Sequence, residues 1–352
     1  MIVWVPCGPR LLASARFYAY RTHEILANRG YASMVFRSPS KTQHDLTEAE
    51  CRRLVRLTAE GKGPHLIVFQ KVWGPRALDA AQSLKRRGHW ILYAGSNLRR
   101  DQAMAIEAHA CIASSEIIRN ELAKYCPDVV VAPEPVDCWV PPGTRSFRES
   151  PIRRLCWIGS EANQATLDRF LPIEAAKRRG VEVKVISQGK RASVQYDPTR
   201  LVEHCADCDV MLVTASINPE ASPNRIIQGW ALGLPVIVDM AHPYSQIIKN
   251  GVDGYLARDW KEFAHVVDTL RDPFKRFRIA EAGFTKANRD FNDEAIGDWW
   301  QHYLNARGWS RVLRRSQCRL AIRPSWMETH RLRDVMRRIH ALLQPRRKSE
   351  RQ

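Results

Sequence analysis

Short apolar runs alternate with stretches of helical apolar spacing along most of the chain, and this alternation limits the possible folds more than any other feature. Strands that follow one another through helices form a parallel sheet with both faces covered. The alternation occurs twice and is interrupted at residues 133–143, which are rich in proline. A chain of 352 residues has room for two such domains. We therefore expect an α/β protein with two Rossmann-like, doubly wound domains.

The expected elements follow from apolar runs for strands and from 3.6-residue periodicity for helices. The predicted strands are Ile2–Pro6, Ala32–Phe36, Leu66–Gln70, Trp90–Ala94, Ala110–Ala113, Val129–Ala132, Leu155–Ile158, Val183–Ile186, Val210–Val213, Pro235–Val238 and Gly254–Leu256. The predicted helices are Ser14–Arg29, Thr47–Glu60, Pro75–Arg87, Ser115–Tyr125, Asn163–Arg179, Thr199–Cys205, Pro223–Leu232, Trp260–Leu270, Phe274–Arg289 and Asp293–Asn305. Two such sheets place a ligand cleft at the carboxyl ends of their strands.

These elements predict five segments. They are an N-terminal domain (1–135), a linker (136–150), a C-terminal domain (151–292), a C-terminal helix able to cross back to the first domain (293–306), and a basic tail (307–352). The tail holds 14 Lys/Arg and 3 Asp/Glu, a net charge of +11 out of +18 for the whole chain.

Cysteine usage and hydropathy indicate a reducing, cytoplasmic setting. Nine cysteines have no framework spacing, and the single C-x-x-C, Cys205 to Cys208, has no second pair, so an incidental role is favoured over a metal or redox role. The sequence contains no run of about 20 apolar residues, and its start does not resemble a signal peptide. We expect a cytoplasmic protein that is able to lie at the inner face of the membrane.

Residues 220–238 form the most informative segment. Ser222 is a good N-cap, so a helix is expected to begin here. Asn224 and Arg225 then fall in its first turn, where free backbone N–H groups hold anions, and Gln228 lies on the same face as Arg225. A carboxylate at Glu220 would meet sugar hydroxyls beside a bound diphosphate. The alternative is an ordinary capped helix with a solvated arginine.

This segment resembles the donor-binding motif of GT-B glycosyltransferases related to family 4. In that motif a Glu, seven residues and a second Glu precede Gly-x-Pro-Val-Ile, and Glu220 and Gln228 stand at the two acidic positions. The resemblance implies that Glu220 contacts the sugar and Gln228 the ribose. Because Gln228 is a departure from the motif, its contact would be weaker, and the preferred sugar and nucleotide stay open.

Three further groups of residues resemble the donor side of that family. Tyr244 and Ser245 precede a G-x-x-G-Y-L segment, and the alternative is that they only shape a loop. Gly159 and Ser160 end the first strand of the second domain, where a glycine lets a phosphate approach. The remaining group, at the end of the next predicted strand, consists of Gly189, Lys190 and Arg191. These residues are alternatively an ordinary turn and surface charge.

The N-terminal half resembles the family over fewer residues. Gln70 and Lys71 at the end of its third predicted strand, with the Trp-Gly-Pro of residues 73–75, resemble a subset of these transferases in bacterial surface-polysaccharide synthesis. Arg16 and Lys71 follow its first and third predicted strands and should face the cleft, where the resemblance places the acceptor. Asp137 matches a common Val-Asp after the sixth strand. The predicted catalytic residues are therefore Glu220, Arg16 and Lys71. For Arg16 and Lys71, roles in packing or in solvent are the alternative.

The resemblance implies a glycosyltransferase that moves a hexose-type sugar from a nucleoside-diphosphate sugar to a glycan or lipid-linked acceptor. It also implies retention of the anomeric configuration. The sequence shows no Asp-x-Asp motif or metal-ligand cluster near the cleft, so we expect no metal and no cofactor beyond the nucleotide-sugar co-substrate. The alternatives are a GT-B nucleotide-sugar epimerase or phosphorylase, and a nucleic-acid-binding protein that uses the basic tail.

Apolar residues interleave with arginines in the tail, from Trp309 to Leu343. Such a segment suits an anionic membrane surface, and less well nucleic acid. A solvated tail is the remaining alternative.

Overall fold

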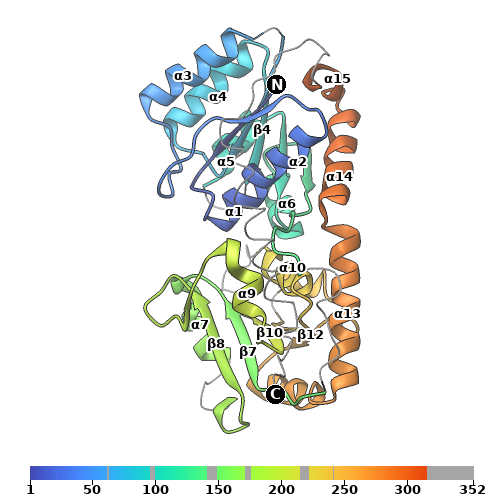
Figure 1. Ribbon diagram of the computed structural model, residues 1–352. Helices are drawn as coiled ribbons and strands as arrows, with labels where there is room; N and C mark the ends of the chain where they lie inside the picture. Colours follow the sequence, from blue (N-terminus) through green and yellow to red (C-terminus); the bar gives the residue numbers. More distant parts are fainter. Residues whose placement is uncertain are drawn as a thin grey trace, which may run out of the picture. The chain divides into compact units, whose positions relative to one another are not determined.

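The computed structural model describes residues 1–61, 63–95, 100–140, 149–170, 176–214, 222–240 and 242–314 (Figure 1). It contains two parallel six-stranded sheets. The first sheet has the strand order β2-β1-β3-β4-β5-β6. Its strands are β1 (Ile2–Pro6), β2 (Ser33–Val35), β3 (Leu66–Gln70), β4 (Trp90–Gly95), β5 (Ala110–Ala113) and β6 (Val129–Val131). We call the part built on this sheet the N-terminal lobe.

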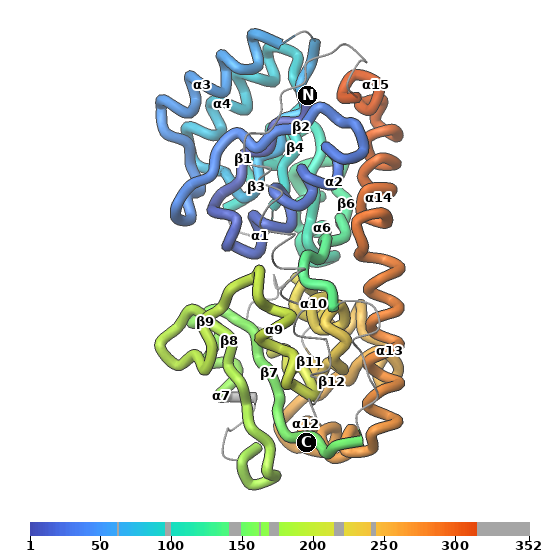
Figure 2. The backbone as a smooth tube through the Cα atoms, viewed as in Figure 1, coloured from blue at the N-terminus to red at the C-terminus, as the bar shows by residue number. Residues whose placement is uncertain are grey.

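The second sheet has the strand order β12-β11-β10-β7-β8-β9, and we call the part built on it the C-terminal lobe. Its strands are β7 (Arg154–Ile158), β8 (Glu182–Ser187), β9 (Val194–Gln195), β10 (Val210–Val213), β11 (Val236–Asp239) and β12 (Tyr255–Ala257). Figure 2 shows β8 and β9 together at one edge of this sheet. Both sheets are parallel throughout, as the alternation of strands and helices predicts.

Helices cover both faces of each sheet. Those that follow the N-terminal strands are α1 (Ala13–Ala15), the π-helix η1 (Arg16–Arg21), α2 (Thr22–Asn28), α3 (Glu48–Ala59), α4 (Pro75–Arg86), α5 (Gln102–Glu107) and α6 (Glu116–Leu122). Those of the C-terminal lobe are η2 (Glu161–Asn163), α7 (Gln164–Phe170), η3 (Pro198–Arg200), α9 (Leu201–Cys205), α10 (Asn224–Ala231), α11 (His242–Ser245), α12 (Trp260–Thr269) and α13 (Pro273–Asp290).

Each sheet has one apolar core on either face. In the N-terminal lobe, Val3 and Phe69 belong to one core, and Trp4 and Val68 belong to the other. This two-sided burial explains why the strands are continuous apolar runs and not alternating ones. The strand order reverses between β1 and β3 in the first sheet and between β7 and β10 in the second. Loops that diverge at such a point leave a crevice, so ligands are expected at these carboxyl ends.

Several local features differ from the predicted elements. The structure adds β9 and α5, which are too short to leave a periodic pattern. The single helix predicted over Ser14–Arg29 is interrupted by the π-turn η1. Such turns are rare in proteins and are frequent beside functional sites.

The prediction of a tail from residue 307 is wrong for residues 307–314. After α14 (Asp293–Ala306) the chain turns and forms α15 (Ser310–Leu313). Trp309 and Leu313 are buried in the core of the N-terminal lobe, and Trp309 stacks on Trp90 with ring centroids 5.4 Å apart. Arg307 forms an ion pair with Asp128. Because this stretch is rich in arginine, its sequence pattern did not predict that Trp309 and Leu313 are core residues.

Helix α14 packs on α2 of the N-terminal lobe, and Ile296 and Trp300 belong to the same core as Trp4 (Figure 1). Helix α13, which precedes it, packs instead on α10 of the C-terminal lobe. No helix among the described residues is both long and apolar enough to cross a membrane.

Candidate functional site

An open pocket of about 950 Å³ lies at the point where the strand order reverses in both sheets. Its C-terminal wall consists of Ile158, Gly159, Ser160, Glu161, Asn163, Gln188, Tyr196, Ser222, Asn224, Arg225 and Gln228. Its N-terminal wall consists of Pro9, Leu11, Leu12, Ala13, Ser40, Lys41 and Thr42. Six residues predicted on the donor side therefore line one pocket: Gly159, Ser160, Ser222, Asn224, Arg225 and Gln228.

Helix α10 brings three of these residues, Asn224, Arg225 and Gln228, to the pocket, and Ser222 precedes the helix. Its buried side carries Ile226, Ile227 and Trp230, which fix the helix against the sheet. It begins at Asn224, one residue later than predicted, and the Ser222 hydroxyl accepts a hydrogen bond from the Asn224 N–H at 3.2 Å. The open first turn therefore faces the pocket, with the positive end of the helix dipole behind it.

Arg225 and Gln228 carry the most informative atoms of the site. Arg225 Nη2 donates to the Tyr244 hydroxyl at 2.8 Å, whereas Nη1 is buried and meets no hydrogen-bond acceptor among the described residues. Gln228 is only 3% exposed, and its Nε2 is likewise buried without a partner in the described part of the chain. Buried donors are nearly always bonded in proteins, so these two donors, three residues apart on α10 and in one pocket, fit a ligand with acceptor groups.

The end of β7 forms the neighbouring part of the wall. A Cβ atom on Gly159 would lie 2.3 Å from the buried Trp157 ring, so only glycine fits there. Ser160 and Glu161 follow and line the pocket. Together with α10 they form a wall of backbone N–H groups, hydroxyls and one guanidinium, a set suited to phosphates, beside the exposed carboxylate of Glu161.

The structure leaves the other predicted donor-side residues outside the pocket lining. Arg191 forms a bidentate ion pair with Asp168, at 2.6 and 2.9 Å. Lys190 is exposed, and Gly189 packs against the side chain of Glu161. Tyr244 is buried, and its hydroxyl accepts a hydrogen bond from Arg225. Ser245 is exposed, and none of these five residues lines the described pocket.

Arg16, predicted to be catalytic, is almost fully buried where the two lobes meet. Its Nε lies 2.7 Å from Asp137 Oδ2, its Nη2 donates to the Tyr196 hydroxyl at 2.9 Å, and its Nη1 donates to the Leu11 carbonyl at 3.2 Å. The guanidinium thus has an ion pair at Nε and a hydrogen bond at each Nη atom. Arg16 holds two pocket residues, Leu11 and Tyr196, and does not itself line the described pocket.

Lys71 has an unusual backbone and a buried acidic neighbour. Its φ of +53° is in the left-handed region, where a residue other than glycine is uncommon. Two hydrogen bonds hold its peptide groups, from Lys71 N to the Ala94 carbonyl and between His44 Nδ1 and the Lys71 carbonyl. The charge of Lys71 lowers the pKa of Glu134, although burial, the larger effect, raises that pKa above its ordinary value.

Glu134 is the main site residue that sequence analysis missed. It is 3% exposed, and both carboxylate oxygens accept from the Ser222 hydroxyl, at 2.5 and 2.6 Å. Its only signal in the sequence is a carboxylate between two prolines, at 133 and 135, which alone predicts no contact with a residue 88 positions away.

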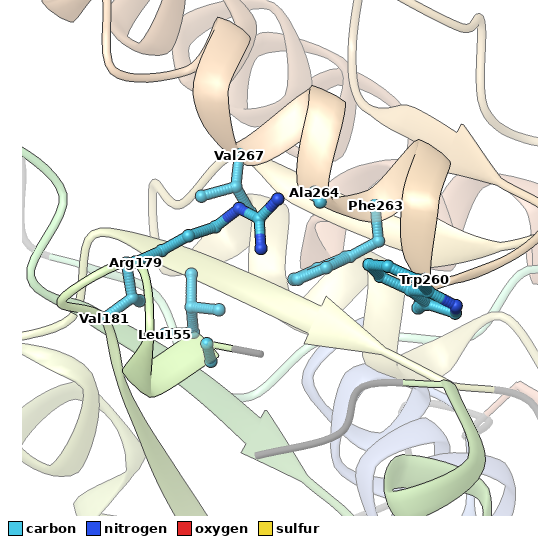
Figure 3. A pocket seen from close by; sticks show the side chains of 8 residues that line it. Leu155, Arg179, Val181, Trp260, Phe263, Ala264 and Val267 are labelled. Atoms are coloured by element: carbon cyan, nitrogen blue, oxygen red, sulfur yellow. The ribbon is translucent and has the colours of Figure 1, made fainter. Parts of the chain in front are cut away.

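Two other features of the chain do not add to the site. Figure 3 shows a second pocket at the amino ends of the C-terminal strands, where Trp260, Phe263 and Val267 approach Leu155. Its volume of about 10 Å³ is no larger than one water requires, so it excludes a sugar nucleotide. Among the described residues, no three His, Cys, Asp or Glu side chains cluster as metal ligands. Glu220 and residues 315–352 lie outside the described residues.

Comparison with known proteins identifies the fold. No protein-family model and no curated protein sequence matches the chain. Anabaena Alr3699/HepE, solved in complex with UDP and glucose, matches at a TM-score of 0.62 and 16% identity, over 87% of this chain and 99% of that chain. A glycosyltransferase from Rickettsia africae ESF-5 matches at 0.59 and 12%, over 90% and 99%.

WaaG, a glycosyltransferase involved in lipopolysaccharide biosynthesis, matches at a TM-score of 0.54 and 15% identity, over 86% of this chain and 99% of that chain. At such low identities the matches show the fold alone. They extend over nearly the whole length of each of these proteins. The predicted fold class is confirmed: the chain has the two-domain, Rossmann-like fold of the GT-B glycosyltransferases.

Proposed function

We propose that this protein is a glycosyltransferase that transfers a sugar from a nucleoside-diphosphate sugar to an acceptor hydroxyl in the pocket between its two sheets. The observation that carries the proposal is the pair of buried, unpartnered donors at the start of α10, Arg225 Nη1 and Gln228 Nε2, found within the described part of a GT-B fold. Such donors suit the oxygens of a diphosphate and of a ribose.

Each of the donor-side residues would hold a different part of the nucleotide sugar. The first turn of α10 and Arg225 would hold the diphosphate, Gln228 the ribose, and Glu220, by resemblance, the sugar. When the bond between the sugar C1 and the β-phosphate oxygen breaks, negative charge grows on the leaving nucleoside diphosphate. The Arg225 guanidinium and the helix dipole would stabilise that charge without a metal ion.

We further propose that the acceptor enters along the N-terminal wall and that the anomeric configuration is retained. This wall combines the half-exposed Leu11, 53% exposed, with Lys41 and two hydroxyl residues, Ser40 and Thr42. Apolar surface beside a cation and hydroxyls suits a lipid-linked or glycan acceptor. A basic tail that touches an anionic membrane would bring such an acceptor close.

A donor and acceptor screen tests the proposed function. UDP-glucose is the first donor to try, because HepE has also been solved in complex with it. We expect release of nucleoside diphosphate that depends on an added glycan or lipid-linked acceptor and falls at least tenfold in Arg225→Ala, which loses a charge-assisted hydrogen bond. Arg258→Ala, which removes an exposed arginine paired with Glu262, is the control and should be unaffected.

Two outcomes would contradict the proposal. Isomerisation of the sugar nucleotide without an acceptor would identify an epimerase. Salt-dependent binding of nucleic acid, without any response to sugar nucleotides, would identify a binding protein that retains the fold.

A further inference from the structure

One contact between the two lobes that the proposed chemistry does not use joins Glu134 and Ser222. Glu134 follows β6 of the N-terminal lobe, and Ser222 precedes α10 of the C-terminal lobe. The Ser222 hydroxyl donates to the Glu134 carboxylate and accepts from the Asn224 N–H, so one hydroxyl joins the carboxylate to the first turn of α10. A change at Glu134 therefore acts directly on the geometry of the predicted phosphate site.

A buried carboxylate is costly unless its charge is compensated. Apart from the Ser222 hydroxyl, the groups that compensate it come from the N-terminal lobe. The Tyr18 hydroxyl of η1 lies beside the carboxylate, and Lys71 supplies the positive charge. Tyr244, the partner of Arg225, lies near enough for the Glu134 charge to raise its pKa, an effect that adds to the larger one of burial. Glu134 thus faces hydroxyl groups of η1 and α11, the Ser222 hydroxyl just before α10, and the charge of Lys71, which follows β3.

The backbone at Lys71 supports a specific role for this charge. A non-glycine residue with φ of +53° is strained, and such strain persists only where surrounding contacts hold it. Here the hydrogen bonds to Ala94 and His44 do so. The fold therefore accepts a strained residue at the position whose positive charge acts on the buried carboxylate.

We propose that Glu134 is a positioning residue: its ionised carboxylate, with Lys71 as counter-ion, orients Ser222 and the first turn of α10 for the donor diphosphate. The proposal rests on the proposed function, because it concerns the same donor site. It differs from a packing role because it requires the negative charge. Donor affinity should then fall with falling pH as Glu134 takes up a proton and its carboxylate no longer accepts on both oxygens.

The test is the dissociation constant of UDP, measured by calorimetry in the full-length protein across the acid and neutral range. Glu134→Gln should weaken UDP binding about tenfold at neutral pH. It should also remove the part of the affinity loss at acid pH that is caused by protonation of the protein. Titration of the UDP phosphates itself is common to all variants and cancels in the comparison. Glu262→Gln, an exposed carboxylate paired with Arg258, is the matched control.

Lys71→Met provides the readout that a packing role would not change. Because the Lys71 charge lowers the pKa of Glu134, its removal should shift the acid decline to higher pH. Ser222→Ala should weaken binding in the wild-type chain and add little in the Glu134→Gln chain, since the two residues act through one hydrogen bond.

The outcomes separate the two proposals. Wild-type protein that binds neither UDP nor any sugar nucleotide contradicts the proposed function. Wild-type protein that binds UDP, with parallel pH profiles for the wild type, Glu134→Gln and Lys71→Met, contradicts the role of Glu134 and leaves the function standing. Thermal melts of each variant check folding, and additive effects of Glu134→Gln and Ser222→Ala would also overturn the role.

Discussion

At the scale of single residues, the start of α10 has one well-packed apolar side and one polar side, on which some donors lack hydrogen-bond partners among the described residues. Gln228 shows the contrast: its side chain is buried, yet its amide nitrogen meets no acceptor among the described residues. An amide left in this state costs roughly 1–3 kcal/mol, so a chain optimised for stability alone would have an apolar residue there. A ligand that accepts a hydrogen bond from this amide, as in the proposed function, explains the residue better.

Gln228→Leu tests this explanation because leucine has a similar size and no polar atoms. We expect the free energy of unfolding without ligand to stay the same or to rise by up to about 1 kcal/mol, since the unpaired amide is removed. The affinity for UDP should fall about three- to tenfold, since one neutral hydrogen bond is lost. Chemical denaturation and calorimetry measure the two effects. A variant that is destabilised and binds UDP normally would show that Gln228 is a structural residue.

Sequence reasoning predicted the residues of α10 better than the residues between the lobes. Arg225 and Gln228 lie in one continuous segment, where spacing fixes their common face. Glu134 meets Ser222 only through the packing of two lobes, which no local pattern records. Basic residues such as Arg191 follow a strand in the expected way, but the sequence did not reveal that Asp168 would pair with Arg191.

At the scale of elements, α10 is held by two glycines that permit close approach. A Cβ on Gly229 would lie 2.5 Å from Val236, and a Cβ on Gly283 of α13 would lie 2.3 Å from the buried Trp230 ring. Both contacts are shorter than side chains tolerate without a shift. The position of the donor helix thus depends on its packing against β11 and α13.

Gly283→Ala should destabilise the protein although alanine favours helices. Alanine gains about 1 kcal/mol in helix propensity, but the clash with Trp230 costs roughly 1–3 kcal/mol, and a tryptophan that is fully buried has little room to move. A shift of α10 should also weaken UDP binding. Thr285→Ala, at an exposed position of the same helix, is the control for denaturation and binding. Equal stability of Gly283→Ala and the wild type would mean that the two helices separate easily.

The elements that the sequence predicted correctly are those with a long, uniform pattern. All eleven predicted strands lie where sheet strands are found. The inner strands of each sheet are buried on both faces and therefore read as plain apolar runs. The two-residue β9 and the six-residue α5 are too short for a period to appear. The π-turn in Arg16–Arg21 inserts one extra residue per turn locally, which apolar spacing alone does not distinguish from a continuous helix.

At the scale of the whole molecule, the last described segments close the core of the first lobe. Helix α14 and the short α15 place Trp300, Trp309 and Leu313 against the N-terminal sheet. The Ala32 N–H also donates to the Leu313 carbonyl at 2.9 Å. The C-terminal segment is therefore a structural part of a lobe that begins more than 300 residues earlier.

Two truncations locate the end of this structural part. A chain that ends at Ala306 should be strongly destabilised, since loss of the buried Trp309 side chain alone costs roughly 3–5 kcal/mol. A chain that ends at Arg314 should keep the thermal transition of the full protein, since it keeps both core residues. Circular dichroism melts measure both. Equal melting temperatures for the two truncated chains would show that α15 does not contribute to the core.

Calorimetric titration of UDP into the wild type, Arg225→Ala and Arg258→Ala decides whether the pocket beside α10 binds the nucleotide. If the pocket at the two strand reversals is the nucleotide site, the wild type and Arg258→Ala should bind alike. Arg225→Ala should lose about 1.5–3 kcal/mol of binding free energy, because one charge-assisted hydrogen bond is removed. Equal UDP affinity in all three proteins would contradict the proposed function of this pocket, because it would place nucleotide binding away from α10.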